Sequence, residues 1–386
     1  MKRSKLSVLT ISMIFLLCIA GCGNQPAPAT PSAPAPAEPS APTAPSAPSA
    51  PSAPSAPSAQ QTRVVVDPID GNEFIVPMES FRIASQAPAY TTGIIVAGAV
   101  DKMVALDESI GNNAWIQDKF PQLKDLPVVF AGNATNLEAL LQTEPDLVFY
   151  ASRYGPDTKA QLLDVGITVV EPTGGSELSP METMKQRQYL YGKLIGGESG
   201  KLAETFLDYF DTKLAEITAI TNTIPDAERP RVIDVRALDP LTIISKEGIG
   251  QEWMTIGGGV NAAADAPGPA GTSGSVEISM EQILAWDPQI IICDSPGYVD
   301  EIYADSAWAN VSAVIDKQLH IMPSGSMSWG YNGPEEALMI QWAATVIQPD
   351  KFTHIDMRAV VKDFYKTFMG LDLSEADVDY MFTRNY

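Results

Sequence analysis

The sequence predicts an α/β fold of two Rossmann-like α/β lobes joined by one long rigid α-helix, with a ligand cleft between the lobes. Three observations predict this fold class. About 325 residues follow residue 60, which is more than one hydrophobic core usually serves. Short apolar segments alternate with helical stretches, as in parallel sheets covered by helices on both faces. One helix–proline–strand unit also occurs twice in the chain.

Residues 1–21 have the features of a secretory signal peptide. A basic start precedes an apolar run, residues 6–20, that is too short to span a bilayer comfortably. The run ends in Ala-Gly-Cys22, which resembles the lipobox of bacterial lipoproteins. The resemblance implies a diacylated Cys22 that anchors the protein at the outer face of the bacterial cytoplasmic membrane or in the periplasm. An ordinary signal peptide with a chance cysteine is the alternative.

Residues 22–59 are predicted to form a tether. Twelve prolines fall between residues 26 and 59, and from residue 39 onward one recurs every three positions. Such a composition cannot build a core, and it favours polyproline II at about 3.1 Å per residue. We therefore expect a semi-rigid spacer on the order of 100 Å long between the lipid anchor and the folded domain.

Charge and cysteine content exclude several kinds of partner. Loss of the signal segment removes three basic residues, so the formal charge changes from −22 to −25. Nucleic acid is excluded as a partner by this charge, and the membrane is reached only through the acyl chains. Cys293 is the one cysteine beyond the lipobox region, and it lies in the apolar run 290–293. It is predicted to be a buried core residue, so no disulfide is expected.

The repeated unit is the most informative feature of the sequence. Glu138 opens two helical turns that end at Pro145, and a three-residue apolar strand follows. Glu281 and Pro288 stand in the same relation 143 residues later, again before an apolar strand. Because proline stops a helix and favours an extended segment, the unit is a helix followed by a strand. Its recurrence predicts two similarly built lobes.

The remaining elements divide the chain into a first lobe (60–197), an interlobe helix (198–224) and a second lobe with a helical tail (225–386). Strands are expected at 81–85, 103–106, 128–130, 147–150 and 168–170, and then at 232–235, 242–245, 290–293 and 319–322. Apolar residues at helical spacing from 199 to 222 predict one helix of roughly 24 residues, which is a stiff connection. Gly370 should end one helix of the tail and Ser374 should cap another, and the tail should pack on the second lobe.

Several motifs carry a family resemblance. They are an opening hairpin and first strand over 64–85, Asn136-Leu-Glu138 with Pro145-Asp-Leu-Val, Gly257-Gly-Gly-Val-Asn261, and Ile278-Ser-Met-Glu281 with Asp287-Pro. From about residue 62 to 352 the chain resembles the periplasmic binding proteins of iron–siderophore, haem and cobalamin ABC importers. The resemblance implies a solute-binding protein without an intrinsic cofactor, whose partner is an ABC permease dimer with its ATPase. We expect a monomer.

Glu138 and Glu281 are the predicted docking residues. In the family that the chain resembles, one glutamate per lobe contacts arginines of the permease. A helix that leads into a parallel strand begins at the edge where strands end, so both glutamates should lie on the rim of the cleft. A capping role is the alternative, because Thr135 and Glu138 could form one capping box and Ser279 and Gln282 another.

Loops at the carboxyl ends of the strands should line the ligand cleft. The predicted ligand-binding residues are Ser85, Tyr90, Arg153, Tyr154, Arg236, Tyr298, Ser328, Trp329 and Tyr331. Rings supply apolar contact area and guanidinium groups pair with carboxylate or catecholate oxygens, so a metal chelate is expected. An iron–siderophore complex is the first expectation, and a corrinoid or haem are the alternatives.

Neither metal ligation by side chains nor catalysis is predicted. His320 and His354 are the only histidines, and no spacing of Cys and His resembles a ligand set. No nucleophile elbow or phosphate-binding loop occurs, and the three glycines from Gly257 lack the spacing of a dinucleotide fingerprint. An enzyme on this fold, or a surface adhesin or sensor lipoprotein, remains the alternative of another class.

Overall fold

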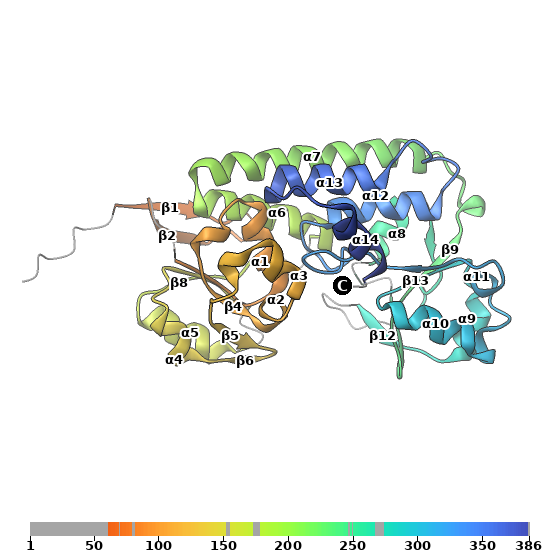
Figure 1. Ribbon diagram of the computed structural model, residues 1–386, viewed down its shortest axis with the longest axis horizontal. Helices are drawn as coiled ribbons and strands as arrows, with labels where there is room; N and C mark the ends of the chain where they lie inside the picture. Colours follow the sequence, from red (N-terminus) through yellow and green to blue (C-terminus); the bar gives the residue numbers. More distant parts are fainter. Residues whose placement is uncertain are drawn as a thin grey trace, which may run out of the picture. The chain divides into compact units, whose positions relative to one another are not determined.

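The computed structural model describes residues 61–384 apart from 69, 79–81, 152–154, 173–177, 246–247, 249 and 267–273. These residues belong to one compact unit, Pro57–Tyr386 (Figure 1). The predicted signal segment, Cys22 and the tether lie outside the described residues, as do Arg153 and Tyr154. Within the described ranges, no helix combines the length and the apolar character that a membrane span requires.

The first lobe is built on a six-stranded sheet in the order β6-β5-β4-β3-β7-β8, parallel except for the short β6. Its strands are β3 (Ile83–Ser85), β4 (Met103–Asp107), β5 (Val128–Ala131), β6 (Ala134–Thr135), β7 (Leu147–Phe149) and β8 (Thr168–Val170). Its helices are α1 (Pro88–Val96), α2 (Glu108–Gly111), α3 (Ala114–Lys119), α4 (Leu137–Gln142) and α5 (Pro156–Asp164). An antiparallel hairpin of β1 (Thr62–Val66) and β2 (Glu73–Pro77) precedes the sheet.

The second lobe also has six strands, in the path β12-β10-β9-β13-β14 with β11 beside β9. The strands are β9 (Arg231–Leu238), β10 (Leu241–Ile244), β11 (Val260–Asn261), β12 (Ser275–Glu277), β13 (Ile290–Cys293) and β14 (Leu319–Ile321). The helices are α8 (Gly250–Ile256), α9 (Met280–Trp286), α10 (Pro296–Ala304) and α11 (Ser312–Ile315). β10 is antiparallel to both its neighbours, so this edge of the sheet departs from the parallel pattern.

The predicted strands are confirmed to within a few residues. The central strands β3, β7 and β13 are buried along their whole length. Helices cover both faces of such strands, and this is why the strands appear in the sequence as continuous apolar runs rather than alternating ones. β9 extends to Leu238, three residues beyond its predicted end, because it continues into the hairpin with β10.

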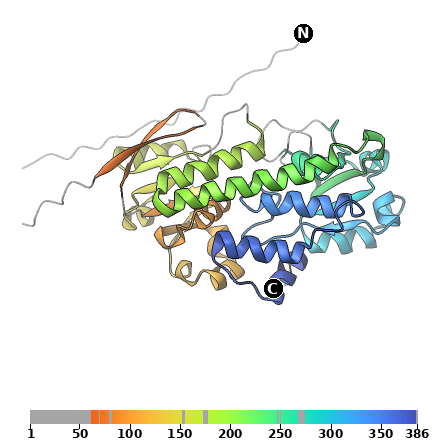
Figure 2. The same ribbon diagram turned by 90° about the horizontal axis from the view of Figure 1, so that it is seen from above.

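Two helices, α6 (Pro180–Ile195) and α7 (Gly197–Thr221), lie side by side along the lobes (Figure 2). α7 agrees with the predicted interlobe helix, and its apolar face buries Phe206, Phe210 and Ile217. The two helices approach closely at Gly192, where a Cβ atom would lie 2.5 Å from the Cβ of Ala203. A larger residue at position 192 would therefore force the pair apart.

α7 is not the only helix that connects the two lobes. α12 (Glu336–Ile347) packs on α7, and α13 (Met357–Met369) contacts both α12 and α1 of the first lobe. Phe206 of α7 meets Phe364 and Phe368 of α13, with ring centroids 6.4 and 5.5 Å apart. One apolar core runs from the first lobe to the second through these helices, and each sheet has a further cluster of its own. The lobes are thus joined by shared packing as well as by the chain.

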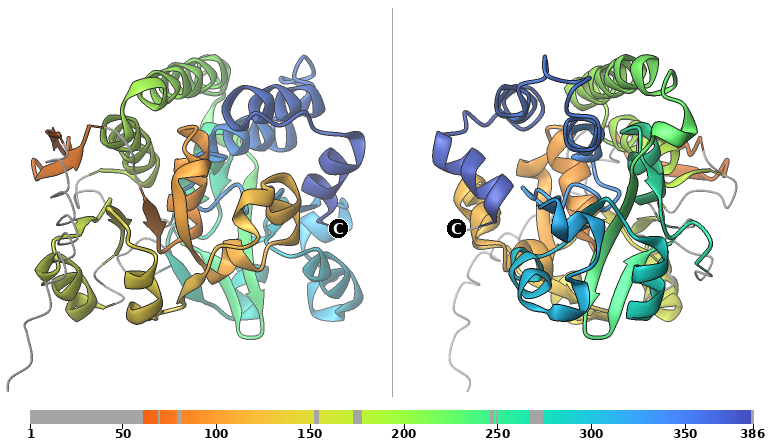
Figure 3. Two further views of the ribbon diagram at one scale, coloured as in Figure 1. Left: turned by 60° about the vertical axis from the view of Figure 1, so that its left-hand side comes forward. Right: turned by 90° about the vertical axis from the view of Figure 1, so that its right-hand side faces the viewer.

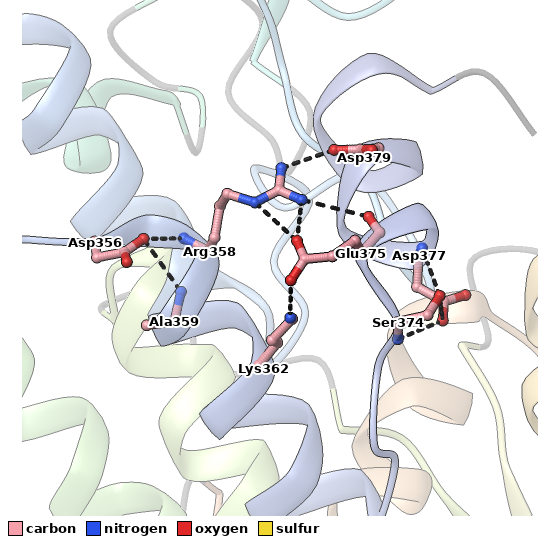
Figure 4. Close-up of polar contacts among 8 residues, drawn as sticks. All are labelled: Asp356, Arg358, Ala359, Lys362, Ser374, Glu375, Asp377 and Asp379. Carbon is pink, nitrogen blue, oxygen red and sulfur yellow. Dashed lines mark hydrogen bonds and ion pairs between the residues drawn. The ribbon is translucent and has the colours of Figure 1, made fainter.

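The C-terminal tail has the predicted elements, and it contacts both lobes. Gly370, with φ 69°, ends α13, and Ser374 caps α14 (Glu375–Thr383) in a capping box with Asp377. Arg358 of α13 donates to Asp379 at 2.7 Å and also binds Glu375 (Figure 4). These contacts join α13 to α14. α14 lies beside α3 of the first lobe (Figure 3). Its end also packs on the second lobe, where Phe382 meets Trp329 and Arg384 binds the Asp294 carbonyl. The predicted packing on the second lobe is therefore present, and the contact with the first lobe is an addition to it.

Candidate ligand cleft and docking surface

A loop of the second lobe, residues 323–335, contacts the first lobe. The hydroxyls of Ser326 in this loop and Thr92 of α1 are 3.1 Å apart, and Asn113 at the start of α3 donates its side-chain amide to the Ser326 carbonyl at 3.3 Å. The buried carboxylate of Glu335 accepts the Ser326 N–H at 3.0 Å and the Tyr365 hydroxyl. Burial raises the pKa of Glu335, although these hydrogen bonds oppose it. The loop is therefore fixed to both lobes by polar contacts.

The same loop contributes to a cluster around Arg236. The Arg236 guanidinium donates to Asp234 at 2.6 Å and lies 4.3 Å from the ring centroid of Tyr331. The Tyr331 hydroxyl donates to Asp294 at 2.9 Å, and the Ser328 hydroxyl donates to the other Asp294 oxygen at 3.4 Å. Asp294 follows β13, and Asp234 lies within β9. Burial raises the pKa of Asp234 to about 6, although the nearby Arg236 lowers it.

Further contacts cross between the lobes at α6. The Arg187 guanidinium lies 5.5 Å from the ring centroid of Tyr90 and donates to the carbonyl of Asn332 at 3.3 Å. The N–H of Met181, in the first turn of α6, donates to Glu252 of α8 at 2.7 Å. A carboxylate at a helix N-terminus is favourably placed, because the helix dipole is positive there. The Arg187 side chain is therefore buried, and its contacts are with Tyr90 and Asn332.

Seven of the nine predicted cleft residues lie in the described part of the chain, in three different settings. Arg236, Ser328 and Tyr331 are brought together in one cluster, and Tyr331 is 40% exposed. Tyr298, at the start of α10, is half-buried against the second-lobe cluster. The side chains of Ser85, Tyr90 and Trp329 are buried. Trp329 packs against Phe382 of the tail with ring centroids 5.7 Å apart, which is why this ring is a core side chain in the structure.

Asp234 and Asp294 were not anticipated from the sequence. A signal for Asp234 was present, because a carboxylate inside the apolar run Val232-Ile-Asp-Val235 must find a partner once buried. Asp294 directly follows a buried strand, which is the usual place of cleft residues in α/β sheets. Cys293, just before it, is buried, and burial raises the pKa of its thiol to about 12, in keeping with a core role.

Glu138 and Glu281 occupy matching positions in the two lobes. Both are exposed residues in the first turn of a short helix, α4 for Glu138 and α9 for Glu281. The two helices lie on the side of the lobes away from α7 (Figure 1). Hydrogen bonds from its own N–H and from Ser279 lower the pKa of Glu281, so this carboxylate is ionised at neutral pH.

The two helices differ in how they are capped. The Ser279–Gln282 capping box is confirmed, with the Ser279 N–H donating to Gln282 at 2.9 Å. The predicted box from Thr135 is wrong, because Thr135 belongs to β6 and the N-cap of α4 is Asn136, whose side chain accepts the Ala139 N–H at 3.1 Å. In the first lobe, therefore, Glu138 does not serve a Thr135 capping box.

No group of three or more His, Cys, Asp and Glu side chains within the described ranges is arranged to hold a metal ion. The arrangement that is present, a ring backed by a guanidinium and flanked by hydroxyls, is one that can bind a small molecule by stacking and hydrogen bonds.

The chain is similar in sequence to known small-molecule binding proteins. A molybdate-binding protein of Haemophilus influenzae, MolA, is 28% identical over 267 residues, 64% of this chain and 74% of that protein. A vitamin B12-binding protein of Vibrio cholerae is 25% identical over 250 residues, 63% of this chain and 81% of that protein. These relatives are binding proteins rather than enzymes, which confirms the expectation that the chain is not an enzyme.

Solved structures give the same result for the fold. A periplasmic solute binding protein from Veillonella parvula superposes with a TM-score of 0.72 at 26% identity, over 83% of this chain and 97% of that one. Molybdate-bound MolA superposes with a TM-score of 0.69 at 22% identity, over 81% and 99% of the two chains. The family model described as periplasmic binding protein matches residues 83–325. The chain therefore belongs to the periplasmic binding protein family.

Proposed function

We propose that the chain is a lipid-anchored solute-binding protein that captures a metal-containing small molecule outside the cytoplasmic membrane and delivers it to an ABC permease. The observation that carries the proposal is the pair of exposed glutamates, Glu138 and Glu281, at matching helix starts on the two lobes. The family match supports the solute-binding role, and the molybdate-binding relative is described as the cognate binding protein of an ABC transporter.

A metal chelate is the first candidate ligand, and a ferric siderophore its first member. Tyr331 offers a partly exposed ring that Arg236 backs, and Ser328 lies beside it. A ring suits the apolar part of a chelate, and a guanidinium suits carboxylate or catecholate oxygens. The vitamin B12-binding relatives support a corrinoid as an alternative ligand. The haem-binding proteins among the structural neighbours support haem as a further alternative.

A compact oxoanion such as molybdate is the second candidate. The similarity to MolA supports it. The cluster around Arg236 does not, because Asp234 and Asp294 already place two carboxylates beside the one guanidinium.

The docking claim is tested by uptake. The double variant Glu138→Ala with Glu281→Ala should abolish permease-dependent uptake of the bound solute and leave its affinity for the purified protein unchanged. Glu198→Ala with Glu216→Ala is the matched control, because it removes two charges from exposed ion pairs of α7. Normal uptake by the Glu138 and Glu281 variant would remove the docking role.

A further inference from the structure

Each helix that carries a proposed docking glutamate also exposes a leucine three residues further on. Leu141 follows Glu138 and is 37% exposed, whereas Leu284 follows Glu281 and is 43% exposed. Residues three apart on a helix lie on the same face, so each leucine is a neighbour of its glutamate on the surface. Each lobe therefore presents a carboxylate and an isobutyl group side by side.

The buried faces of the two helices are equally alike. Leu140 of α4 and Ile283 of α9 are completely buried, each in the separate apolar cluster of its own lobe. The buried anchor and the exposed leucine are adjacent residues in both helices, and the corresponding positions are 143 residues apart throughout. In each adjacent pair the first side chain, Leu140 or Ile283, packs in the core of its lobe. The second, Leu141 or Leu284, stays exposed on the surface.

Single exposed apolar side chains are normal on protein surfaces, so exposure alone means little. The informative point is the repetition, because the same apolar group accompanies the same carboxylate on both lobes. Resting on the proposed function, we propose that Leu141 and Leu284 belong to the surface that docks on the permease dimer. Each half of that partner offers a basic side chain next to an apolar recess.

The two kinds of group serve different steps of docking. Charged groups that face opposite charges on a partner speed and orient the encounter, and without them the two proteins do not dock productively. Apolar side chains that lose contact with water in a complex stabilise it in proportion to the area buried. Differences in affinity among variants of one interface arise mostly from the dissociation rate. Glu138 and Glu281 would therefore guide docking, while Leu141 and Leu284 would hold the complex long enough for the solute to be transferred.

The inference is tested by measuring binding of the full mature chain to its permease–ATPase complex in lipid nanodiscs. Leu141→Ala and Leu284→Ala should each weaken binding about fivefold through faster dissociation, and together about 25-fold. Leu141→Met and Leu284→Met should retain wild-type binding, because methionine restores the apolar volume. Ile75→Ala and Ile315→Ala are matched controls, since these side chains are even more exposed but lie on β2 and α11.

The outcomes separate this inference from the proposed function. If the wild-type chain binds the permease and both leucine variants bind equally well, the leucines have no part in docking and the function stands. If only one of the two leucine variants weakens binding, the partner does not offer an equivalent apolar site to each lobe. If the wild-type chain does not bind, the proposed function itself is wrong. Melting temperatures equal to wild type in the leucine variants are expected, and they show that lost binding is not lost folding.

Discussion

The indole N–H of Trp115, on α3 of the first lobe, donates a hydrogen bond to Asp377 of the final helix at 3.3 Å. The same carboxylate forms an ion pair with Lys119 at 2.6 Å and caps its own helix with Ser374. At the other end of α14, Arg384 binds the carbonyl of Asp294 in the second lobe. The helix α14 thus connects the first lobe to the second.

Asp377→Ala should destabilise the protein by about 2 kcal/mol, because it removes the Asp377 half of the capping box together with the acceptor for Trp115 and Lys119. The free energy of unfolding from urea titration measures this loss. Asp379→Ala on the same helix is the control, because it breaks only an exposed ion pair with Arg358 and should cost less than about 1 kcal/mol. Equal losses in the two variants would show that the tail does not depend on the contact with Trp115 and Lys119.

Tyr331→Ala should weaken ligand binding about tenfold, which is about 1.4 kcal/mol. The substitution removes the partly exposed ring of the cluster around Arg236. Tyr303→Ala is the matched control, since Tyr303 is 43% exposed on α10, against 40% for Tyr331, but lies outside the cluster. Isothermal titration with the bound solute compares the two variants. Equal affinities would place the ligand away from Tyr331 and Arg236.

Stability should depend on pH through Asp107, the N-cap of α2. Burial raises the pKa of this carboxyl from 3.8 to about 6, although hydrogen bonds from Ile110, Ser109 and Thr91 oppose the shift. The folded state then binds the proton more tightly than the unfolded state, so the free energy of unfolding decreases as the pH rises from about 4 to about 6. The decrease due to Asp107 is at most about 3 kcal/mol.

Asp107→Asn tests this dependence, because an asparagine keeps the helix cap but does not titrate. Its unfolding free energy should change less between pH 4 and pH 6 than that of the wild type. Asp164→Asn, at the exposed end of α5, controls for the loss of one acidic side chain. A wild-type slope in the Asp107 variant would mean that this group does not set the pH dependence.

Cys22→Ser should release the protein from the membrane fraction without changing its ligand affinity, because the acyl chains are proposed to be the only anchor. Fractionation of cells, together with metabolic labelling by a fatty acid, measures the effect. Labelling that persists in the variant would place the lipid on another residue.

The sequence was sufficient for the framework of the fold, because that framework follows local rules. Buried parallel strands appear as apolar runs, and the amphipathic spacing of α7 marks its face from Ala203 to Ile217. The helix–proline–strand unit was visible for the same reason. Boundaries were less certain where one residue could take two roles, as at Thr135, which pairs in β6 and leaves the cap of α4 to Asn136.

The interlobe surface could not be predicted in the same way, because it depends on partners far apart in the sequence. Ser326 meets Thr92 across 234 positions, and no periodicity signals such a contact. A Cβ atom on Gly325 would lie 1.8 Å from the Tyr365 hydroxyl, so that glycine has a packing role that only the folded chain reveals. Trp329 follows a strand like a cleft residue, yet the tail that covers it lies some fifty residues further on.

The most direct test of the account is a tryptophan-fluorescence titration of residues 57–386 against ferric siderophores, cobalamin or cobinamide, haemin, and molybdate. The account predicts saturable quenching at micromolar or tighter concentration by one of these metal-containing classes. The absence of any response from protein shown to be folded would contradict the claim that the chain captures a metal-containing solute.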